Sequence, residues 1–271
     1  MERSCLLWHP STLGTVNIIY AGHVIGTIPV LPAYIQNARI GGTTEENISL
    51  SINIAKSGWT QGARYVILAR DDQFSDALAA VPLSKKLEAP ILMTDSVELD
   101  DRTLAEMREL GAQNVYIVGG TVAISQDIQD SLSNEFAVTR IAGQQGYDTA
   151  ALISSKVGID PTHTVYLANG SALPDAMAIS AFAAGQGNPI LLTDRDSLPP
   201  STIQALTDLE VRNVVLLGGT AVIGTLVENE VRAKYSVKRW GGYDRYDTQS
   251  IIFQNLLTRK FPSLRFTLHL G

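Results

Sequence analysis

The sequence has few residues of the types that build cross-links and metal sites. Its 271 residues include one cysteine, Cys5, and four histidines. A single cysteine excludes an intramolecular disulfide framework and a cysteine-based zinc cluster. The histidines lack the H-x-x-x-H spacing that places two metal ligands on one helical face. We therefore expect no bound metal and no cofactor.

Positive charge is also scarce. The chain has 21 Lys and Arg against 27 Asp and Glu, which gives a net charge of -6 and a pI near 5.2. A broad nucleic-acid-binding surface requires an excess of basic residues, so we expect no nucleic-acid partner. Any other polyanion would need a localised basic site.

Long uninterrupted apolar runs are missing too. The stretch from Leu13 to Leu31 is apolar in bulk, but polar residues, glycines and a proline interrupt it. It is a poor transmembrane helix, and we expect no membrane span. An export signal is conceivable, since Arg3 precedes the apolar stretch, but the stretch is interrupted and no clear A-x-A cleavage site follows it, so no convincing signal peptide is recognised. Residues 1–37 are assigned to an N-terminal segment of uncertain structure.

The sequence does contain an internal repeat. Similarity at a fixed period indicates duplicated structural units. Three segments recur with one shift of 99 residues: VYIVGGTVAIS at 115–125 and VVLLGGTAVIG at 214–224, APILMTD at 89–95 and NPILLTD at 188–194, and FSDAL at 74–78 and LPDAM at 173–177.

Each repeat is predicted to alternate strands with helices. Short apolar runs, separated by helical segments such as 101–110 and 126–136, are typical of parallel strands buried on both faces. Thr43 and Glu46 form a capping box before the first helix. The predicted strands are Tyr65–Ala69, Ile91–Thr94 and Val115–Val118, matched by Val165–Ala168, Ile190–Thr193 and Val214–Leu217.

The predicted fold class is therefore α/β, as tandem repeats with parallel sheets, two complete and a third incomplete. The first repeat is assigned to residues 38–137, the second to 138–236, and the start of the third to 237–271. In the third, a strand is predicted at 266–270 and a helix at 248–257. The apolar face of that helix lacks the rest of its repeat, so we expect self-association through it. Its residues are Ile251, Ile252, Leu256 and Leu257.

The two Gly-Gly-Thr turns follow apolar runs and precede helices, as phosphate-binding loops often do. Such loops follow patterns like GxGxxG or GxxxxGK[ST]. The turns at 119–121 and 218–220 lack the third glycine and the lysine. Because a tight strand-to-helix turn also requires glycine, we favour a structural role for them over a nucleotide site.

Residues 140–150, RIAGQQGYDTA, and 239–248, RWGGYDRYDT, with the PILLT and LPDA segments of the second copy, resemble the type 2 cell-wall-binding repeat family of clostridial-type surface proteins. The resemblance covers residues 38 to about 260. It implies Toprim-like or flavodoxin-like repeats, three of them packed around a pseudo-threefold axis. It also implies a non-catalytic module on the cell surface that attaches an effector domain to anionic polymers of a Gram-positive cell wall.

The chain departs from this family pattern in places. The family's Arg-Tyr-x-Thr box is kept only as Arg245-Tyr246-Asp247-Thr248, while the second copy has Gly146 in place of the arginine. No effector domain is recognisable, so the chain resembles a fragment or a truncated member.

Candidate polymer-binding residues come from two arguments. Thr94 with Asp95, and Thr193 with Asp194, follow predicted strands at the edge where ligands of parallel sheets gather. The resemblance adds the segments from Pro90 and Pro189 to these threonines. The alternative is that threonine and aspartate only cap loops or helices.

Arginines form the second group of candidates. Arg140 and Arg239 recur once per repeat, as does Arg39, and a guanidinium suits phosphate or carboxylate groups on a polymer. Arg245 belongs to the complete box. For the recurring arginines, an ion pair with an aspartate such as Asp148 or Asp247 is the structural alternative.

Two other functions stay open. Asp194-Arg195-Asp196 supplies the D-x-D pair of a Toprim-like metal-dependent phosphoryl-transfer enzyme, but the first copy reads Asp95-Ser96-Val97, and a magnesium ion would be poorly held. A soluble sugar- or nucleotide-binding module has no sharper motif in its favour. Asp76 and Asp175 are interpreted as complements of helix dipoles, and Tyr147 and Tyr246 as packing residues.

Overall fold

The computed structural model describes residues 15–20, 23–29 and 47–260, and the chain divides into two compact units, residues 1–40 and 41–271. In the first unit, β1 (Thr15–Tyr20) and β2 (His23–Pro29) pair as an antiparallel hairpin. The predicted capping box and the predicted strand at 266–270 lie outside the described residues. None of the described helices is long and apolar enough to cross a membrane.

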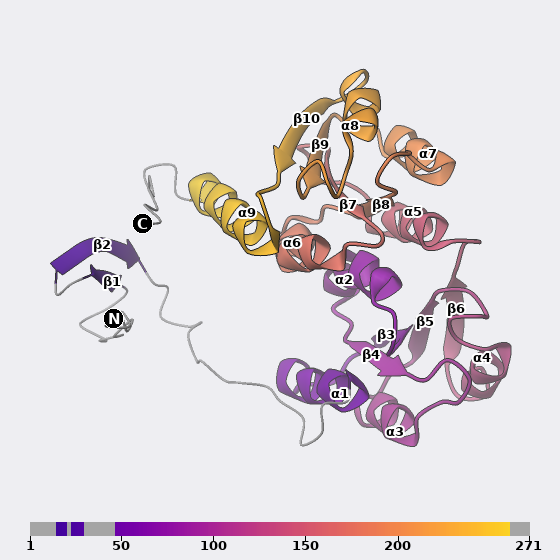
Figure 1. Cartoon of the computed structure of the whole chain (residues 1–271). Helices are drawn as coiled ribbons and strands as arrows, with labels where there is room; N and C mark the ends of the chain where they lie inside the picture. The colour runs from indigo at the N-terminus through magenta and orange to yellow at the C-terminus, as the bar shows by residue number, and fades with distance from the viewer. Residues whose placement is uncertain (1–14, 21–22, 30–46, 261–271) are drawn as a thin grey trace. The chain divides into compact units, whose positions relative to one another are not determined.

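The second unit contains two four-stranded parallel sheets (Figure 1). In the first sheet the strand order is β4-β3-β5-β6. Its strands are β3 (Tyr65–Arg70), β4 (Ile91–Thr94), β5 (Asn114–Val118) and β6 (Ala137–Ile141). The helices that accompany it are α1 (Asn47–Gly58), α2 (Ser75–Leu87), α3 (Asp101–Glu109) and α4 (Gln126–Leu132).

The second sheet has the order β8-β7-β9-β10, which repeats the order of the first. Its strands are β7 (Thr164–Asn169), β8 (Ile190–Thr193), β9 (Asn213–Leu217) and β10 (Ser236–Trp240). Its helices are α5 (Gly146–Val157), α6 (Leu173–Gln186), α7 (Pro200–Asp208) and α8 (Thr225–Arg232), and α9 (Arg245–Lys260) follows as α5 follows the first sheet. The predicted α/β fold with duplicated parallel sheets is confirmed. The Toprim-like label stays a prediction.

A fourth strand in each sheet is absent from the prediction. β6 and β10 pair with β5 and β9 in parallel, and these edge strands contain Arg140 and Arg239. Their burial alternates from exposed to partly buried, whereas β7 is buried throughout. A search for continuous apolar runs therefore finds the central strands and the apolar edge strands β4 and β8, but misses β6 and β10. The arginine motif that opens the second and the third predicted repeat thus ends the sheet of the preceding repeat.

Alternate residues of each central strand enter different cores. Val66 and Leu68 of β3 pack with α1, α3 and α4, while Ile67 and Ala69 face the opposite side. In the second sheet Val165 and Leu167 pack with α7 and α8. This period of two is the geometry of a strand buried on both faces.

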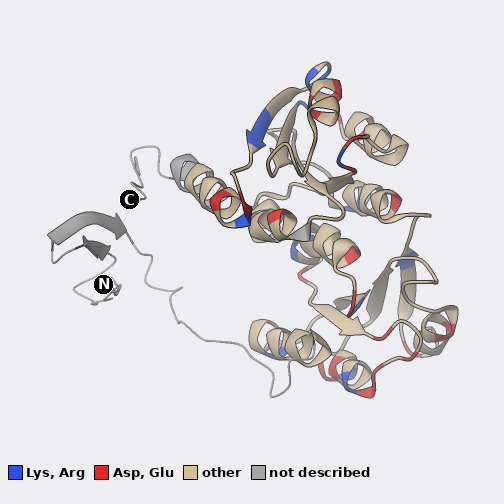
Figure 2. Cartoon of the chain, viewed as in Figure 1, with Lys and Arg blue, Asp and Glu red and all other residues tan. Residues whose placement is uncertain are grey.

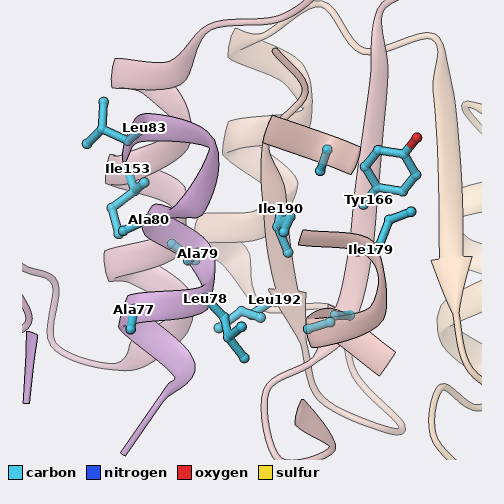
Figure 3. Close-up of a cluster of buried hydrophobic side chains, with 14 of the residues drawn as sticks. Ala77, Leu78, Ala79, Ala80, Leu83, Ile153, Tyr166, Ile179, Ile190 and Leu192 are labelled. Atoms are coloured by element: carbon cyan, nitrogen blue, oxygen red, sulfur yellow. The ribbon is translucent and has the colours of Figure 1, made fainter. Parts of the chain in front are cut away.

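The remaining faces of both sheets share one core, which joins the two repeats. Helix α2 of the first repeat packs against α5 and α6 of the second. Its residues Ala77, Ala79 and Ala80 are buried, and their small side chains let the helices approach closely (Figure 3). Lys86 Nζ also donates to the carbonyl oxygens of Lys156 and Val157 at 2.8 and 3.0 Å. This places a positive charge at the C-terminus of α5, where the helix dipole favours it.

Substitution of Gly218 by alanine is expected to destabilise the fold. Gly218 has a φ of +97°, and a Cβ there would lie 2.4 Å from Oδ2 of Asp175. We expect Gly218→Ala to lower the free energy of unfolding by about 1–3 kcal/mol in urea denaturation. The control is Gly185→Ala in α6, where a Cβ would meet nothing within 4 Å. Equal stability of the two variants would contradict the role assigned to the turn.

Candidate functional site

The threonines at the carboxyl ends of β4 and β8 are buried inside their own loops. Thr94 Oγ1 accepts from the amide of Asp100 at 3.0 Å and donates to the carbonyl of Glu98 at 3.2 Å. Thr193 Oγ1 lies 3.1 Å from the carbonyl oxygens of Asp194 and Ser197. Both side chains are 0% exposed. These contacts favour the loop-closing interpretation, since neither hydroxyl can reach a polymer.

The adjacent aspartates are exposed and organise the same loops. Asp95 Oδ1 accepts from the amides of Val97 and Glu98 at 2.7 and 3.2 Å. Asp194 Oδ1 accepts from the amide of Arg195 at 2.6 Å. Each carboxylate therefore stabilises a turn and still faces solvent.

The predicted prolines lie at the other ends of these strands. Pro90 and Pro189 directly precede β4 and β8, are buried, and accept hydrogen bonds through their carbonyls from Ile67 and Tyr166 at 3.0 and 3.2 Å. Each threonine is the fourth residue after its proline, about 13 Å away at the usual rise of a strand. The prolines and the aspartates do not form one site.

Arg140 and Arg239 fasten the edge strands to the Gly-Gly turns. Arg140 donates to the carbonyl of Gly119 at 2.9 Å, and Arg239 donates to the carbonyl of Gly218 at 2.8 Å. A second contact goes to Gln129 in the first repeat and to Glu228 in the second. Desolvation lowers the pKa of Arg140. Both guanidinium groups are used within the fold.

The aspartate partners suggested for these arginines are wrong. Asp148 accepts from the amide of Gln145 at 3.0 Å, and Asp247 accepts from the amide of Tyr243 at 2.9 Å. Each carboxylate therefore satisfies a backbone donor at the start of α5 or α9, which is a common use of acidic residues in the first helical turn.

The Gly-Gly turns contact two aspartates, Asp76 after β3 and Asp175 after β7. Gly119 has a φ of +105°, and a Cβ there would lie 2.8 Å from Oδ2 of Asp76. Gly218 makes the same approach to Asp175. The recurrence of FSDAL as LPDAM signalled these aspartates in the sequence, but the prediction used them only as dipole complements.

In the second repeat, the residues next to this contact line an open cavity of about 360 Å³. It is lined by Asp175 after β7, Gly219 after β9, and Tyr243 and Arg245 after β10, among others. The cavity thus lies beyond the carboxyl ends of the strands. Because β7 lies between β8 and β9, the strand order reverses here, and such points are where open α/β sheets bind ligands.

The cavity has two opposite charges, Asp175 and Arg245, which interact electrostatically. Asp175 is 6% exposed, and within the described residues it has no hydrogen bond or ion pair. Burial raises its pKa, and the positive charge of Arg245 partly opposes this effect. The side chain of Arg245 is exposed and likewise has no bonded partner in the described part of the chain. Tyr243 is fully exposed at the rim.

The matching place in the first repeat is different. Gln144, Gln145 and Gly146 stand where the second repeat has Tyr243, Asp244 and Arg245. Asp76 Oδ1 is sealed from solvent and has no hydrogen-bond partner among the residues that the structure describes. Burial raises the pKa of Asp76, partly opposed by the charge of Arg70.

Comparison with known proteins identifies the family. Residues 39–129 and 140–228 each match Cell wall binding domain 2 (CWB2). The chain belongs to this family. The two matched regions begin at the second residue of the predicted first repeat and at Arg140.

Relatives of known name are longer proteins. The chain is 32% identical over 219 residues to N-acetylmuramoyl-L-alanine amidase LytC of Bacillus subtilis (strain 168), which covers 80% of this chain and 42% of LytC. It is 32% identical over 216 residues to the amidase enhancer of the same organism, covering 80% of this chain and 29% of the enhancer. The structure of Cwp6 from Clostridium difficile matches with a TM-score of 0.72 at 24% identity, over 88% of this chain and 40% of Cwp6. The chain spans less than half the length of these proteins.

The buried carboxyl of Asp76 should make stability depend on pH. Its folded pKa is raised, so the protonated form stabilises the fold below the ordinary carboxyl pKa, and this contribution is lost as pH rises through the folded pKa. We expect Asp76→Asn to gain stability relative to the unmodified chain between roughly pH 3 and pH 7. Urea denaturation at both pH values measures this.

The matched control is Asp127→Asn, at an exposed position in the first turn of α4. It should not show the gain. A constant stability difference between Asp76→Asn and the unmodified chain across the two pH values would show that burial does not perturb this carboxyl.

Proposed function

We propose that the chain is a non-catalytic module that anchors a surface protein non-covalently to anionic polymers of a Gram-positive cell wall. The observation that carries this proposal is the CWB2 match over both repeats. The relatives named N-acetylmuramoyl-L-alanine amidase LytC and amidase enhancer are consistent with a cell-wall partner. The amidase name belongs to LytC, of which this chain spans 42%.

The charge distribution limits how such a polymer can be held. The net charge is -6, and Figure 2 shows basic residues scattered among acidic ones in this view. A polyanion therefore needs individual basic side chains that are not already used in the fold. Arg140 and Arg239 are bonded to carbonyls, which makes Arg245 the better contact. Of the other candidates, Asp95 and Asp194 keep solvent-facing carboxylates that can accept polymer hydroxyls.

The phosphoryl-transfer alternative has less support. Asp196 of the D-x-D pair lies 3.0 Å from the guanidinium of its neighbour Arg195, and Asp194 is engaged with the loop backbone. Among the described residues, no group of three or more His, Cys, Asp or Glu side chains could hold a metal ion. Binding without turnover is therefore the function we favour.

Self-association through α9 is a further part of the proposal. Ile252 of its predicted apolar face is buried, but Phe253 is 60% exposed. We expect the Phe253→Ser variant to have a lower average mass by light scattering than the unmodified chain, because the substitution removes an exposed apolar side chain from α9. A monodisperse monomer before substitution would refute this part.

Retention on cell walls is the direct test of the proposed function. We expect the chain to sediment with purified Gram-positive cell walls and to be lost from walls chemically stripped of their anionic polymer. Because screening weakens exposed ion pairs, raising salt from about 0.05 M to about 0.5 M should release it. Equal retention on intact and stripped walls would refute the polymer as partner.

A further inference from the structure

The cavity of the second repeat holds two opposite charges that do not meet. Asp175 and Arg245 both line it, yet the structure shows no hydrogen bond or ion pair for either side chain among the described residues. A buried carboxylate without a donor is unfavourable, and the fold keeps one at a point where ligands bind in sheets of this kind. An incoming group that contacts both side chains would satisfy both.

The chemistry of the cavity indicates what that group is. A carboxylate accepts hydrogen bonds, and a neutral hydroxyl can supply them without adding charge. A guanidinium pairs with phosphate or carboxylate oxygens. Tyr243, fully exposed at the rim, offers an aromatic face with a polar tip. Together these groups suit a unit that has hydroxyls next to one acidic group.

We propose that this cavity binds one repeating unit of the wall polymer, with a hydroxyl donating to Asp175 and a phosphate or carboxylate paired with Arg245. This inference rests on the proposed function, because that function supplies the polymer. It adds the location of the site and the chemical class of the unit bound.

The first repeat lacks this site. Gly146 replaces the arginine, and a side chain there would begin 3.8 Å from Oδ1 of Asp76. That oxygen is already closed off from solvent. The same backbone therefore binds polymer in the second repeat and serves only as a scaffold in the first, which provides an internal control.

Two substitutions in the full chain test the site. Arg245→Gln removes the cation at an exposed position, and Asp175→Asn keeps the shape of the side chain but removes its charge. We expect each to weaken retention on intact walls by at least about tenfold, the usual size for hydrogen bonds to charged groups. Asp76→Asn is the matched control and should bind as the unmodified chain does. Thermal melts establish that each variant is folded.

Equal retention of Arg245→Gln and the unmodified chain would overturn the inference while leaving the proposed function intact. If the unmodified chain is not retained at all, the proposed function fails, and soluble probes still test the cavity. Glycerol 3-phosphate and glucuronate, titrated separately, should shift the amide resonances of Gly219 and Tyr243 in the unmodified chain only. The probe that acts distinguishes a phosphate from a carboxylate polymer, and no shift with either probe overturns the inference.

Discussion

The contact between a Gly-Gly turn and the aspartate beneath it determines the carboxyl-end geometry of both sheets. A Cβ at Gly119 or Gly218 would lie 2.8 or 2.4 Å from that carboxylate. Only glycine at these positions therefore lets the turn after β5 or β9 approach the start of α2 or α6. On its other side, an arginine of the edge strand donates to the carbonyl of the same glycine, as Arg239 does to Gly218. Strand, turn and helix are therefore positioned together.

This shared scaffold supports two different chemical environments. In the first repeat the aspartate is sealed beneath the turn, and its neighbours are glutamine and glycine. In the second, the equivalent aspartate lines an open cavity opposite Arg245. The contact between the Gly-Gly turn and the aspartate recurs in both repeats, whereas several lining residues differ, among them the three at 144–146 and 243–245. Fold and binding site are set by separate residues, as is general for α/β sheets that serve several functions.

The shared core makes the two repeats one structural body. Buried alanines of α2 allow it to pack between α5 and α6, and Lys86 bonds the end of α5. The start of α5 also reaches the second sheet, since Tyr147 lies 3.1 Å from where a Cβ of Gly170 would be. Burial and the nearby charge of Asp194 raise the pKa of Tyr147. The segment that follows β6 therefore lies at the junction between the two repeats.

Much of this architecture can be predicted from the sequence, because burial on both faces of a parallel strand leaves a local trace. Apolar runs, glycine turns and the 99-residue shift predict the central strands, their duplication and the family. The edge strands β6 and β10 leave a weaker trace, since half of each faces solvent. The sequence therefore suggested Arg140 and Arg239 as polymer contacts or as partners of an aspartate, and it did not predict their bonds to the glycine carbonyls.

Only the tertiary structure decided which polar groups meet. The sequence placed Thr94 and Thr193 at a ligand-binding edge, but loop closure buries both. It did not place Asp175 and Arg245 in one cavity, because they come from helices far apart in the chain and line the same cavity only once β7, β9 and β10 are in order. Periodicity reports whether a side chain is buried, whereas its partner depends on how distant elements pack.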